Sequence, residues 1–335
     1  MPALAVADEL RERGAEVLFI GADRAERSLV LAAGYAFEQI SVSGLDRRNP
    51  LRALRALAQA ARALRRSRAL LAAARVDVVM GAGGYVAAPV ALAAWTRRIP
   101  VVLTEADSHL GLTNRALAPL ARSVCLAFPI AGRRGKRYRV TGRPVAPPTA
   151  DRDAARTAFG VGPQEQLVLV FGGSLGSRTI NTAALEGLDG AGFRVLHICG
   201  ERDWPALRER PRGARYDLRE YLERSQFAQA LAASDLVVAR SGGSIFEIAA
   251  YGRPAILVPF PAASADHQAT NAAWMEHAGA AVVLADAECS GPRLAAEVGR
   301  LVGDRPKLEA MGRAARALAR PEAAAEVATI VLAAA

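Results

Sequence analysis

Short apolar runs alternate with alanine-rich amphipathic stretches along the whole chain. Valine, leucine and isoleucine dominate runs such as "VDVVMGAGG" in the first half and "QLVLVFGGS" in the second. Continuous apolar runs of this kind are typical of parallel strands that helices cover on both faces. The pattern predicts six strands in each half and an α/β fold with two doubly wound, Rossmann-like parallel-sheet domains that face a cleft.

A proline-rich segment, "TGRPVAPPTADRDAARTAFGVGP", separates the two halves. We expect one domain over residues 1–147 and a second over 148–335, with the last helix returning to the first domain. Asp151 and Asp153 form a D-x-D pattern that holds a metal in other enzymes. At a helix start, however, Asp151 is expected to be an N-cap, and we predict no metal site there.

The net charge of +10 and the pI near 10.3 indicate an anionic partner, namely a nucleic acid, a phosphorylated substrate or an anionic membrane surface. Composition alone does not choose among these partners. Apolar runs fall short of the roughly 20 residues of a membrane span, and a signal-peptide pattern is absent, so we expect a cytoplasmic protein. The widely separated Cys125, Cys199 and Cys289 are expected to be buried and reduced.

Two Gly-Gly-Ser turns, in "VFGGSLGSRTIN" and "ARSGGSIFEIAAYG", each lie between a predicted strand and a predicted helix. Glycines allow a close approach of the backbone, and a helix start offers free N–H groups, so such turns suit a phosphate. A tight turn between a strand and a helix needs glycine in any case. Glu247, after the second turn, is placed either to accept ribose hydroxyls or simply to complement the helix dipole.

Polar residues gather at two other loops. "TEADSHLGLTNRALAP" follows a first-domain strand and offers Glu105, Asp107 and His109 as candidate bases, with Asn114 close behind. "ADHQATNA" offers Gln268 and Asn271 where a loop enters a helix, with Asp266 as a potential N-cap. Such residues equally often cap helices and close turns.

An arginine-rich helix is predicted from Leu51 to Arg75, with seven arginines and no acidic residue. A basic amphipathic helix can lie on an anionic membrane surface. The ordinary alternative is a surface helix that packs its leucine face on the domain.

Six motifs occur together in a characteristic order: "GAGGYVAAPVALAA", "LGLTNRALAPLA", "VTGRPV", "FGGSLGSRTIN", "ASDLVVARSGGSIFEIAAYGRPAILVPFP" and "ADHQATNAAWMEHAGAA". With these motifs the chain resembles the MurG family of glycosyltransferase family 28, the peptidoglycan N-acetylglucosaminyltransferases that convert lipid I to lipid II. The resemblance implies the GT-B fold and an inverting transfer of N-acetylglucosamine from UDP-N-acetylglucosamine. The alternatives are a GT-B enzyme with a different acceptor and a non-catalytic nucleotide-sugar-binding protein.

The resemblance also implies partners and site residues. The partners are UDP-N-acetylglucosamine, undecaprenyl-linked muramyl pentapeptide and the anionic inner face of the plasma membrane, with no nucleic acid, metal or cofactor. The first domain meets the acceptor and the second binds the donor. In the second domain Ser174 is expected to contact the nucleotide, the turn from Arg240 to Ser244 to cradle the diphosphate, Glu247 to hold the ribose and Gln268 to hold the sugar. The full expected substrate-binding set is Asp107, Asn114, Ser174, Leu222, Arg240, Gly242, Gly243, Ser244, Ile245, Phe246, Glu247, Gln268 and Asn271.

The opening "MPALAVADEL" resembles the helix that, in this family, follows a first strand and a loop of the type GGTGGH. That loop carries the family's candidate base. The resemblance therefore predicts that Met1 is a misassigned or truncated start and that upstream codons encode the strand and the loop. Otherwise Glu105, Asp107 or His109 is expected to act as the base.

Overall fold

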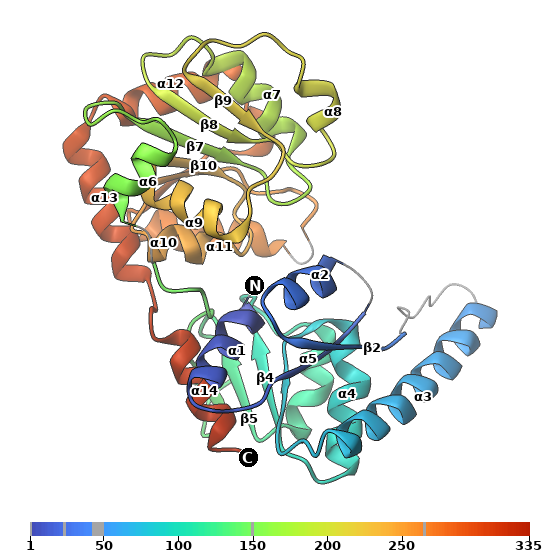
Figure 1. Cartoon of the computed structure of the whole chain (residues 1–335). Coiled ribbons are helices and arrows are strands. Elements are labelled where there is room, and N and C mark those ends of the chain that lie inside the picture. The colour runs from blue at the N-terminus through green and yellow to red at the C-terminus, as the bar shows by residue number, and fades with distance from the viewer. Residues whose placement is uncertain (1, 23–24, 42–49, 149–150, 264–265) are drawn as a thin grey trace. The chain divides into compact units, whose positions relative to one another are not determined.

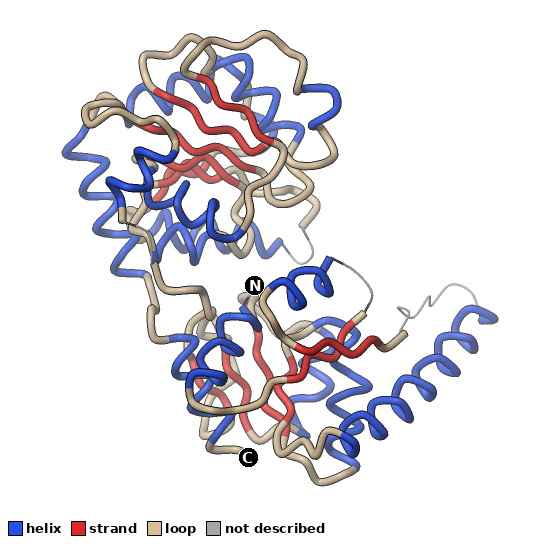
Figure 2. Tube along the Cα trace, viewed as in Figure 1, coloured by secondary structure: helices blue, strands red, loops and turns tan. Residues whose placement is uncertain are grey.

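The computed structural model describes residues 2–22, 25–41, 50–148, 151–263 and 266–335. In this part of the chain the predicted runs form twelve strands, and the paired strands are parallel (Figures 1 and 2). Every predicted strand is observed. The chain divides into two compact units. Unit 1 comprises Met1–Ala146 together with Arg320–Ala335, and unit 2 comprises Pro147–Ala319.

Unit 1 contains two parallel sheets and helices from both ends of the chain. The sheets have the strand orders β1-β2 and β3-β4-β5-β6. The elements are α1 (Pro2–Glu12), β1 (Leu18–Gly21), α2 (Ala25–Ala32), β2 (Ala36–Gln39), α3 (Pro50–Ala73), β3 (Val79–Gly81), α4 (Gly84–Thr96), β4 (Val101–Glu105), α5 (Leu112–Leu117), η1 (Ala118–Leu120), β5 (Ser123–Leu126), β6 (Tyr138–Val140) and α14 (Ala323–Leu332).

The last helix, α14, packs against the first helix, α1, inside unit 1 (Figure 1). Val6 and Leu10 of α1 share an apolar cluster with Val327 and Val331 of α14, and all four side chains are buried. The apolar face of each amphipathic helix is therefore buried against the other helix and against the sheet beneath.

A cavity of about 1160 Å³ separates the two sheets of unit 1. It is lined by the whole of β1 and β3 and by apolar side chains such as Leu4 of α1 and Val331 of α14. Within the described residues β1 pairs only with β2, and β3 only with β4. Both strands thus turn an unpaired edge, with its N–H and C=O groups, toward the same slot.

Unit 2 has one six-stranded parallel sheet, ordered β12-β11-β10-β7-β8-β9, with helices around it (Figure 2). The described elements are α6 (Arg152–Ala158), β7 (Leu167–Phe171), α7 (Arg178–Gly187), β8 (Arg194–Ile198), α8 (Trp204–Leu207), β9 (Tyr216–Arg219), α9 (Arg224–Ala233), β10 (Leu236–Ala239), α10 (Ile245–Ala250), β11 (Ala255–Leu257), α11 (His267–His277), β12 (Ala281–Val283), η3 (Asp286–Glu288), α12 (Gly291–Val302) and α13 (Arg305–Leu318). All residues of β7 and β10 are buried, as expected for the central strands of a covered sheet.

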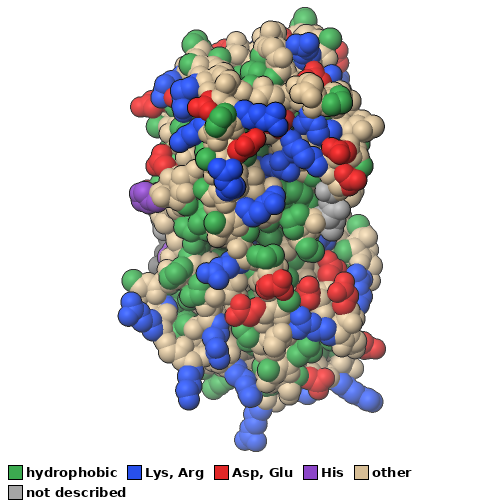
Figure 3. Space-filling model, turned by 90° about the vertical axis from the view of Figure 1, so that its left-hand side faces the viewer, with side chains coloured by type: hydrophobic (Ala, Val, Ile, Leu, Met, Phe, Trp, Pro, Cys, Tyr) green, Lys and Arg blue, Asp and Glu red, His purple; other side chains and the backbone are tan. Residues whose placement is uncertain are grey.

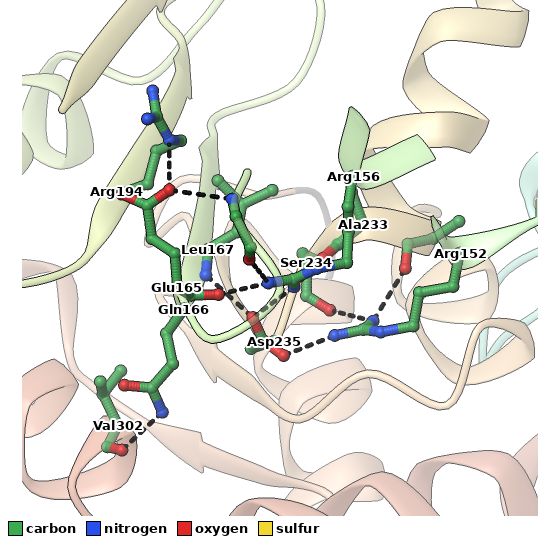
Figure 4. A network of polar contacts seen from close by, with 12 residues as sticks. Arg152, Arg156, Glu165, Gln166, Leu167, Arg194, Ala233, Ser234, Asp235 and Val302 are labelled. Atoms are coloured by element: carbon green, nitrogen blue, oxygen red, sulfur yellow. Dashed lines mark hydrogen bonds and ion pairs between the residues drawn. The ribbon is translucent and has the colours of Figure 1, made fainter. Parts of the chain in front are cut away.

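Asp151 is the N-cap of α6, as predicted, because its carboxylate accepts hydrogen bonds from the backbone N–H groups of Asp153 (2.9 Å) and Ala154 (3.4 Å). At the amino ends of β7 and β10, Asp235 joins α6 to the sheet through Arg152 and Arg156 (Figure 4). This ionic cluster lies at the edge of the sheet opposite the Gly-Gly-Ser turns.

Candidate functional site

The two Gly-Gly-Ser turns of unit 2 meet at the point where the strand order reverses. From β7 the chain moves outward to β8 and β9, and it then returns to place β10 on the other side of β7. One turn follows β7 and the other follows β10, so both lie at the carboxyl edge of adjacent central strands. In open α/β sheets this reversal point is where ligands bind.

The first turn spans 172–177 and is held tightly against the end of β8. The N–H of Gly176 donates to the carbonyl of Gly173 (2.9 Å), and the hydroxyl of Ser177 caps α7 by accepting from the N–H of Ile180 (3.4 Å). Gly176 has a φ of +77°, and a Cβ there would lie 1.9 Å from the carbonyl oxygen of Cys199. Glycine is therefore required at this position for both its φ and its lack of a side chain. Ser174 is exposed at the tip of the turn.

The second turn, 241–244, is fastened to α11. The hydroxyl of Ser241 donates to the carbonyl of Gln268 (2.7 Å), and the side-chain amide of Asn271 donates to the carbonyl of Ser241 (2.9 Å). Gln268 also accepts a hydrogen bond from the N–H of Phe260 (3.0 Å) through its side-chain oxygen. This arrangement leaves the Gln268 amide nitrogen near Gly242, where a Cβ would lie 3.9 Å from it.

Asn271 is 2% exposed, and within the described residues its Oδ1 atom has no hydrogen-bond partner. Because the whole side chain is buried, Asn271 holds the turn through the Ser241 carbonyl rather than facing a ligand. Asp266 occupies the N-cap position of α11 in a left-handed conformation (φ +53°), and its side chain makes no capping hydrogen bond.

Arg240 points its guanidinium into unit 2. Its Nη1 atom donates to the carbonyls of Val258 and Pro259, both at 3.1 Å, and pairs with Asp286 at 2.5 Å. The guanidinium also lies over the ring of Phe260. In this arrangement the Arg240 side chain clamps the loop after β11, whereas the family resemblance implied that the turn from Arg240 to Ser244 lies against the diphosphate.

The remaining predicted residues of unit 2 fall into two groups. Ile245, Phe246 and Leu222 are buried, so their side chains pack the site rather than face a ligand. Gly242, Gly243, Ser244 and Glu247 are partly exposed around the start of α10, with Glu247 in its first turn. These four residues, together with Ser174 and Gln268, therefore remain the predicted ligand contacts at the reversal point.

In unit 1 the loop after β4 is organised by a buried carboxylate. The side chain of Glu105, 7% exposed, accepts from the N–H of Asp107 (3.2 Å), the N–H of Gly111 (2.9 Å) and the amide of Asn114 (3.0 Å). The Asn114 amide also donates to the carbonyl of Thr104 (3.0 Å). Three donors occupy the oxygens of Glu105, and this argues against the expectation that Glu105 acts as a base.

Asp107 and His109 are half-exposed on the same loop. Among the described residues no hydrogen bond to either side chain is observed, so both are available to a ligand at this edge of the sheet. Asn114 is 2% exposed, and its Oδ1 atom has no partner within the described residues. The amide nitrogen of Asn114 holds the loop through Thr104 and Glu105, and its buried oxygen accepts no hydrogen bond from the described residues.

Sequence reasoning missed a buried polar chain beneath the first turn. Asn181, His197, Asp203 and Tyr216 come from four different segments and are hydrogen-bonded in series. A single histidine inside the apolar run "FRVLHICGE" gives no signal of such a chain. The three cysteines, by contrast, are free and buried as predicted, and burial raises the pKa of the Cys125 thiol to about 12 and that of Cys199 to about 11.

Comparison with known proteins gives the same family for both units. Residues 1–126 match the glycosyltransferase family 28 N-terminal domain, and residues 167–327 match the glycosyltransferase family 28 C-terminal domain. The UDP-N-acetylglucosamine--N-acetylmuramyl-(pentapeptide) pyrophosphoryl-undecaprenol N-acetylglucosamine transferase of Moorella thermoacetica is 41% identical over 99% of this chain and 94% of its own length.

Solved structures agree with the sequence matches. MurG of Acinetobacter baumannii has a TM-score of 0.74 and 27% identity, covering 99% of this chain and 95% of its own. The calicheamicin glycosyltransferase CalG4, at 18% identity and a TM-score of 0.72 over 99% of this chain and 94% of its own, shares the fold. The predicted GT-B class of two Rossmann-like units is thus confirmed, and the chain belongs to glycosyltransferase family 28 and, within it, to the MurG family.

Proposed function

We propose that the protein is an inverting glycosyltransferase that moves N-acetylglucosamine from UDP-N-acetylglucosamine to lipid-linked N-acetylmuramyl pentapeptide in peptidoglycan synthesis. The observation that carries this proposal is the meeting of two Gly-Gly-Ser turns at the reversal point of the unit 2 sheet, in a chain of the MurG family. Backbone N–H groups at such turns suit the diphosphate of a nucleotide sugar.

In this proposal unit 2 binds the donor. Ser174 contacts the nucleotide, the turn around Gly242 to Ser244 lies against the diphosphate, and Glu247 accepts the ribose hydroxyls. Gln268 offers its amide nitrogen beside Gly242, and Asn271 holds the turn through the Ser241 carbonyl. The N–H groups fixed at these turns stabilise the negative charge that grows on the diphosphate as UDP leaves.

Unit 1 is proposed to meet the acceptor. In the transfer, an acceptor hydroxyl attacks the anomeric carbon of the donor sugar. The bond between that carbon and the phosphate oxygen breaks, UDP leaves, and the proton of the hydroxyl passes to a base. The resemblance places this base on the glycine-rich loop that precedes the counterpart of α1 in the family. Asp107 and His109 are the alternative candidates in this chain, once Glu105 is assigned to its own loop. Among the described residues no group of three His, Cys, Asp or Glu side chains is arranged to hold a metal.

Release of UDP tests the proposal. The purified chain is incubated with UDP-N-acetylglucosamine and a lipid I analogue, and UDP is followed by a coupled assay. Release that requires the analogue supports the proposed reaction. Release with a soluble sugar or another lipid in its place favours a GT-B enzyme with a different acceptor. Binding of UDP without any release favours a non-catalytic nucleotide-sugar-binding protein.

Membrane attachment is the proposed role of α3. In its described part Arg62, Arg65 and Arg68 are exposed, whereas Ala63, Ser67 and Leu71 are buried at helical spacing. The helix therefore does pack on unit 1 through one face, and its cations lie on the other face. The neighbouring helix α4 exposes Leu92 and Trp95, which suits an interface between water and lipid.

No described helix is both long enough and apolar enough to cross a membrane. Lys and Arg side chains are spread among acidic ones over the face drawn in Figure 3, so on that face the positive charge does not form a single patch. The exposed arginines of α3, together with Leu92 and Trp95, therefore carry the proposal of an attachment to the inner face of the plasma membrane.

The slot between β1 and β3 supports the expectation of a further strand in unit 1. Among the described residues, the strands on both sides have backbone groups that pair with no other strand, and the cavity between them is lined by apolar side chains. We propose that an apolar strand followed by a glycine-rich loop fills it. A form extended by the upstream in-frame codons is compared with the 335-residue form for UDP release. Equal activity of the two forms, or a stop codon directly upstream, would overturn this proposal.

A further inference from the structure

A chain of buried polar side chains lies beneath the first Gly-Gly-Ser turn. Asn181 of α7 is 2% exposed, His197 of β8 is fully buried and Tyr216 of β9 is 7% exposed. Asp203, just before α8, completes the chain and is paired with Arg202 at 2.9 Å. Hydrogen bonds from Arg202 chiefly, and from Asn181, lower the pKa of Asp203 despite its partial burial. The chain therefore ends on a carboxylate.

The hydrogen bonds allow one assignment of protons. The amide nitrogen of Asn181 faces two acceptors, the carbonyl of Cys199 (2.9 Å) and the carboxylate of Asp203 (2.8 Å), so it donates to both. The Asn181 oxygen must then accept, and the atom opposite it is Nε2 of His197 at 3.0 Å, which therefore carries the ring proton. The other ring nitrogen, Nδ1, accepts from the hydroxyl of Tyr216 (2.8 Å).

The His197 imidazole stays neutral at physiological pH, so its single ring proton remains on Nε2. Burial lowers the pKa of His197 to about 3, and the positive charge of Arg212 acts in the same direction. Both N–H donors of Asn181 are used and its oxygen accepts from His197, so the side chain has a single orientation.

The Cys199 carbonyl, which accepts from Asn181, lies directly against the backbone of the turn 172–177. A Cβ on Gly176 would lie 1.9 Å from the Cys199 oxygen, and a Cβ on Gly200 would lie 2.2 Å from the backbone nitrogen of Gly176. The backbone of the turn thus lies directly on the end of β8. A shift of the Cys199 carbonyl must displace the turn, and with it Ser174.

We propose that Asn181 is a positioning residue for the donor-binding turn, and that His197 holds Asn181 in its required orientation. The proposal rests on the proposed function, in which this turn contacts the nucleotide. Asn181 touches no ligand itself. It fixes the Cys199 carbonyl, and that carbonyl fixes the position of the turn.

Binding of UDP and steady-state kinetics test the proposal. Asn181→Leu keeps much of the volume and removes both donors. We expect it to weaken UDP binding about tenfold or more by calorimetry and to lower kcat/KM for UDP-N-acetylglucosamine, because a small misplacement of a binding loop has a large effect on rate. His197→Leu removes the donor to Asn181 and should have a similar effect. His197→Gln restores an N–H near the Nε2 position and should recover most of the affinity.

A matched control separates positioning from general destabilisation. Ser234 is fully buried in unit 2, and its hydroxyl donates to the carbonyl of Leu231 (3.0 Å) at the opposite edge of the sheet. Ser234→Ala should lower the unfolding midpoint and leave UDP affinity unchanged. If Asn181→Leu does not fold, the comparison of His197→Leu with His197→Gln decides the question through the same two measurements.

The outcomes distinguish this proposal from the proposed function. If the parent protein binds UDP and the folded variants of Asn181 and His197 bind it within twofold of the parent, the positioning role is wrong and the proposed function stands. Equal losses in His197→Leu and His197→Gln also contradict the role of the Nε2 proton. If the parent protein itself does not bind UDP, both proposals fail together.

Discussion

Removal of the Asp235 carboxylate should destabilise unit 2 strongly. Asp235 pairs with Arg152 at 2.5 Å and with Arg156 at 3.2 Å, and it accepts from the N–H of Leu167 at 2.8 Å (Figure 4). The two arginines lie on α6, whereas Leu167 opens β7. Asp235→Ala therefore breaks the ionic connection between the first helix of unit 2 and its sheet.

The size of the effect follows from the exposure of the partners. The side chain of Arg156 is 10% exposed and that of Asp235 is 22%, so Arg156 would be left as a buried charge without its carboxylate. Loss of one partner of such a pair costs about 3–5 kcal/mol. Arg152 adds little to this, because its side chain is 37% exposed and keeps hydrogen bonds to Ala232 and Ser234. For Asp235→Asn, which retains one acceptor, we expect about 1.5–3 kcal/mol.

Urea unfolding followed by tryptophan fluorescence measures this change in the free energy of unfolding. Of the three tryptophans, Trp204 and Trp274 lie in unit 2, so a Trp95→Phe background makes the signal specific to that unit. Glu309→Ala is the control. The side chain of Glu309 is 56% exposed and that of its partner Arg305 is 82% exposed, so this ion pair should contribute less than about 1 kcal/mol. A loss in Asp235→Ala no larger than in Glu309→Ala would refute the reasoning.

Three further predictions concern pH, the donor site and the membrane. The His197 pKa is lowered from 6.5 to about 3 in the folded protein, so below pH 6.5 the unfolded state binds a proton that the folded state does not. Stability should therefore fall by about 1.4 kcal/mol per pH unit as the pH drops from 6.5 toward 3. Urea midpoints measured across this range should show a shallower slope in His197→Gln, and an identical slope would contradict the assignment. Glu247→Ala should weaken UDP binding about ten- to hundredfold by calorimetry, since hydrogen bonds to a charged group contribute about 1.5–3 kcal/mol, and unchanged affinity would exclude the ribose role. Co-sedimentation with anionic vesicles should decrease as salt rises, because exposed charges are screened over about 10 Å at 0.1 M ionic strength, and salt-insensitive binding would argue against the arginines of α3.

The sequence by itself determined the local elements and the family. All twelve predicted strands are observed. The central strands β7 and β10 were predicted from continuous apolar runs, because a residue buried on both faces of a sheet must be apolar wherever its neighbours come from. Asp151 was predicted as an N-cap because capping depends only on the next few backbone N–H groups. The Gly-Gly-Ser turns were predicted as phosphate-binding candidates for the same reason: a strand, a turn and a helix start are contiguous in sequence.

Only the tertiary structure decided which of these elements meet. Strand order places β10 beside β7, and this brings two turns about seventy residues apart to one sheet edge. The tertiary structure also shows that Glu105 accepts hydrogen bonds within its own loop and that Arg240 points into unit 2. It places Asn181 and His197 under the donor-binding turn. A pattern along the chain records the burial of each residue. The partner of a buried carboxylate, amide or imidazole, however, comes from a distant segment, and its identity depends on the packing of the whole unit.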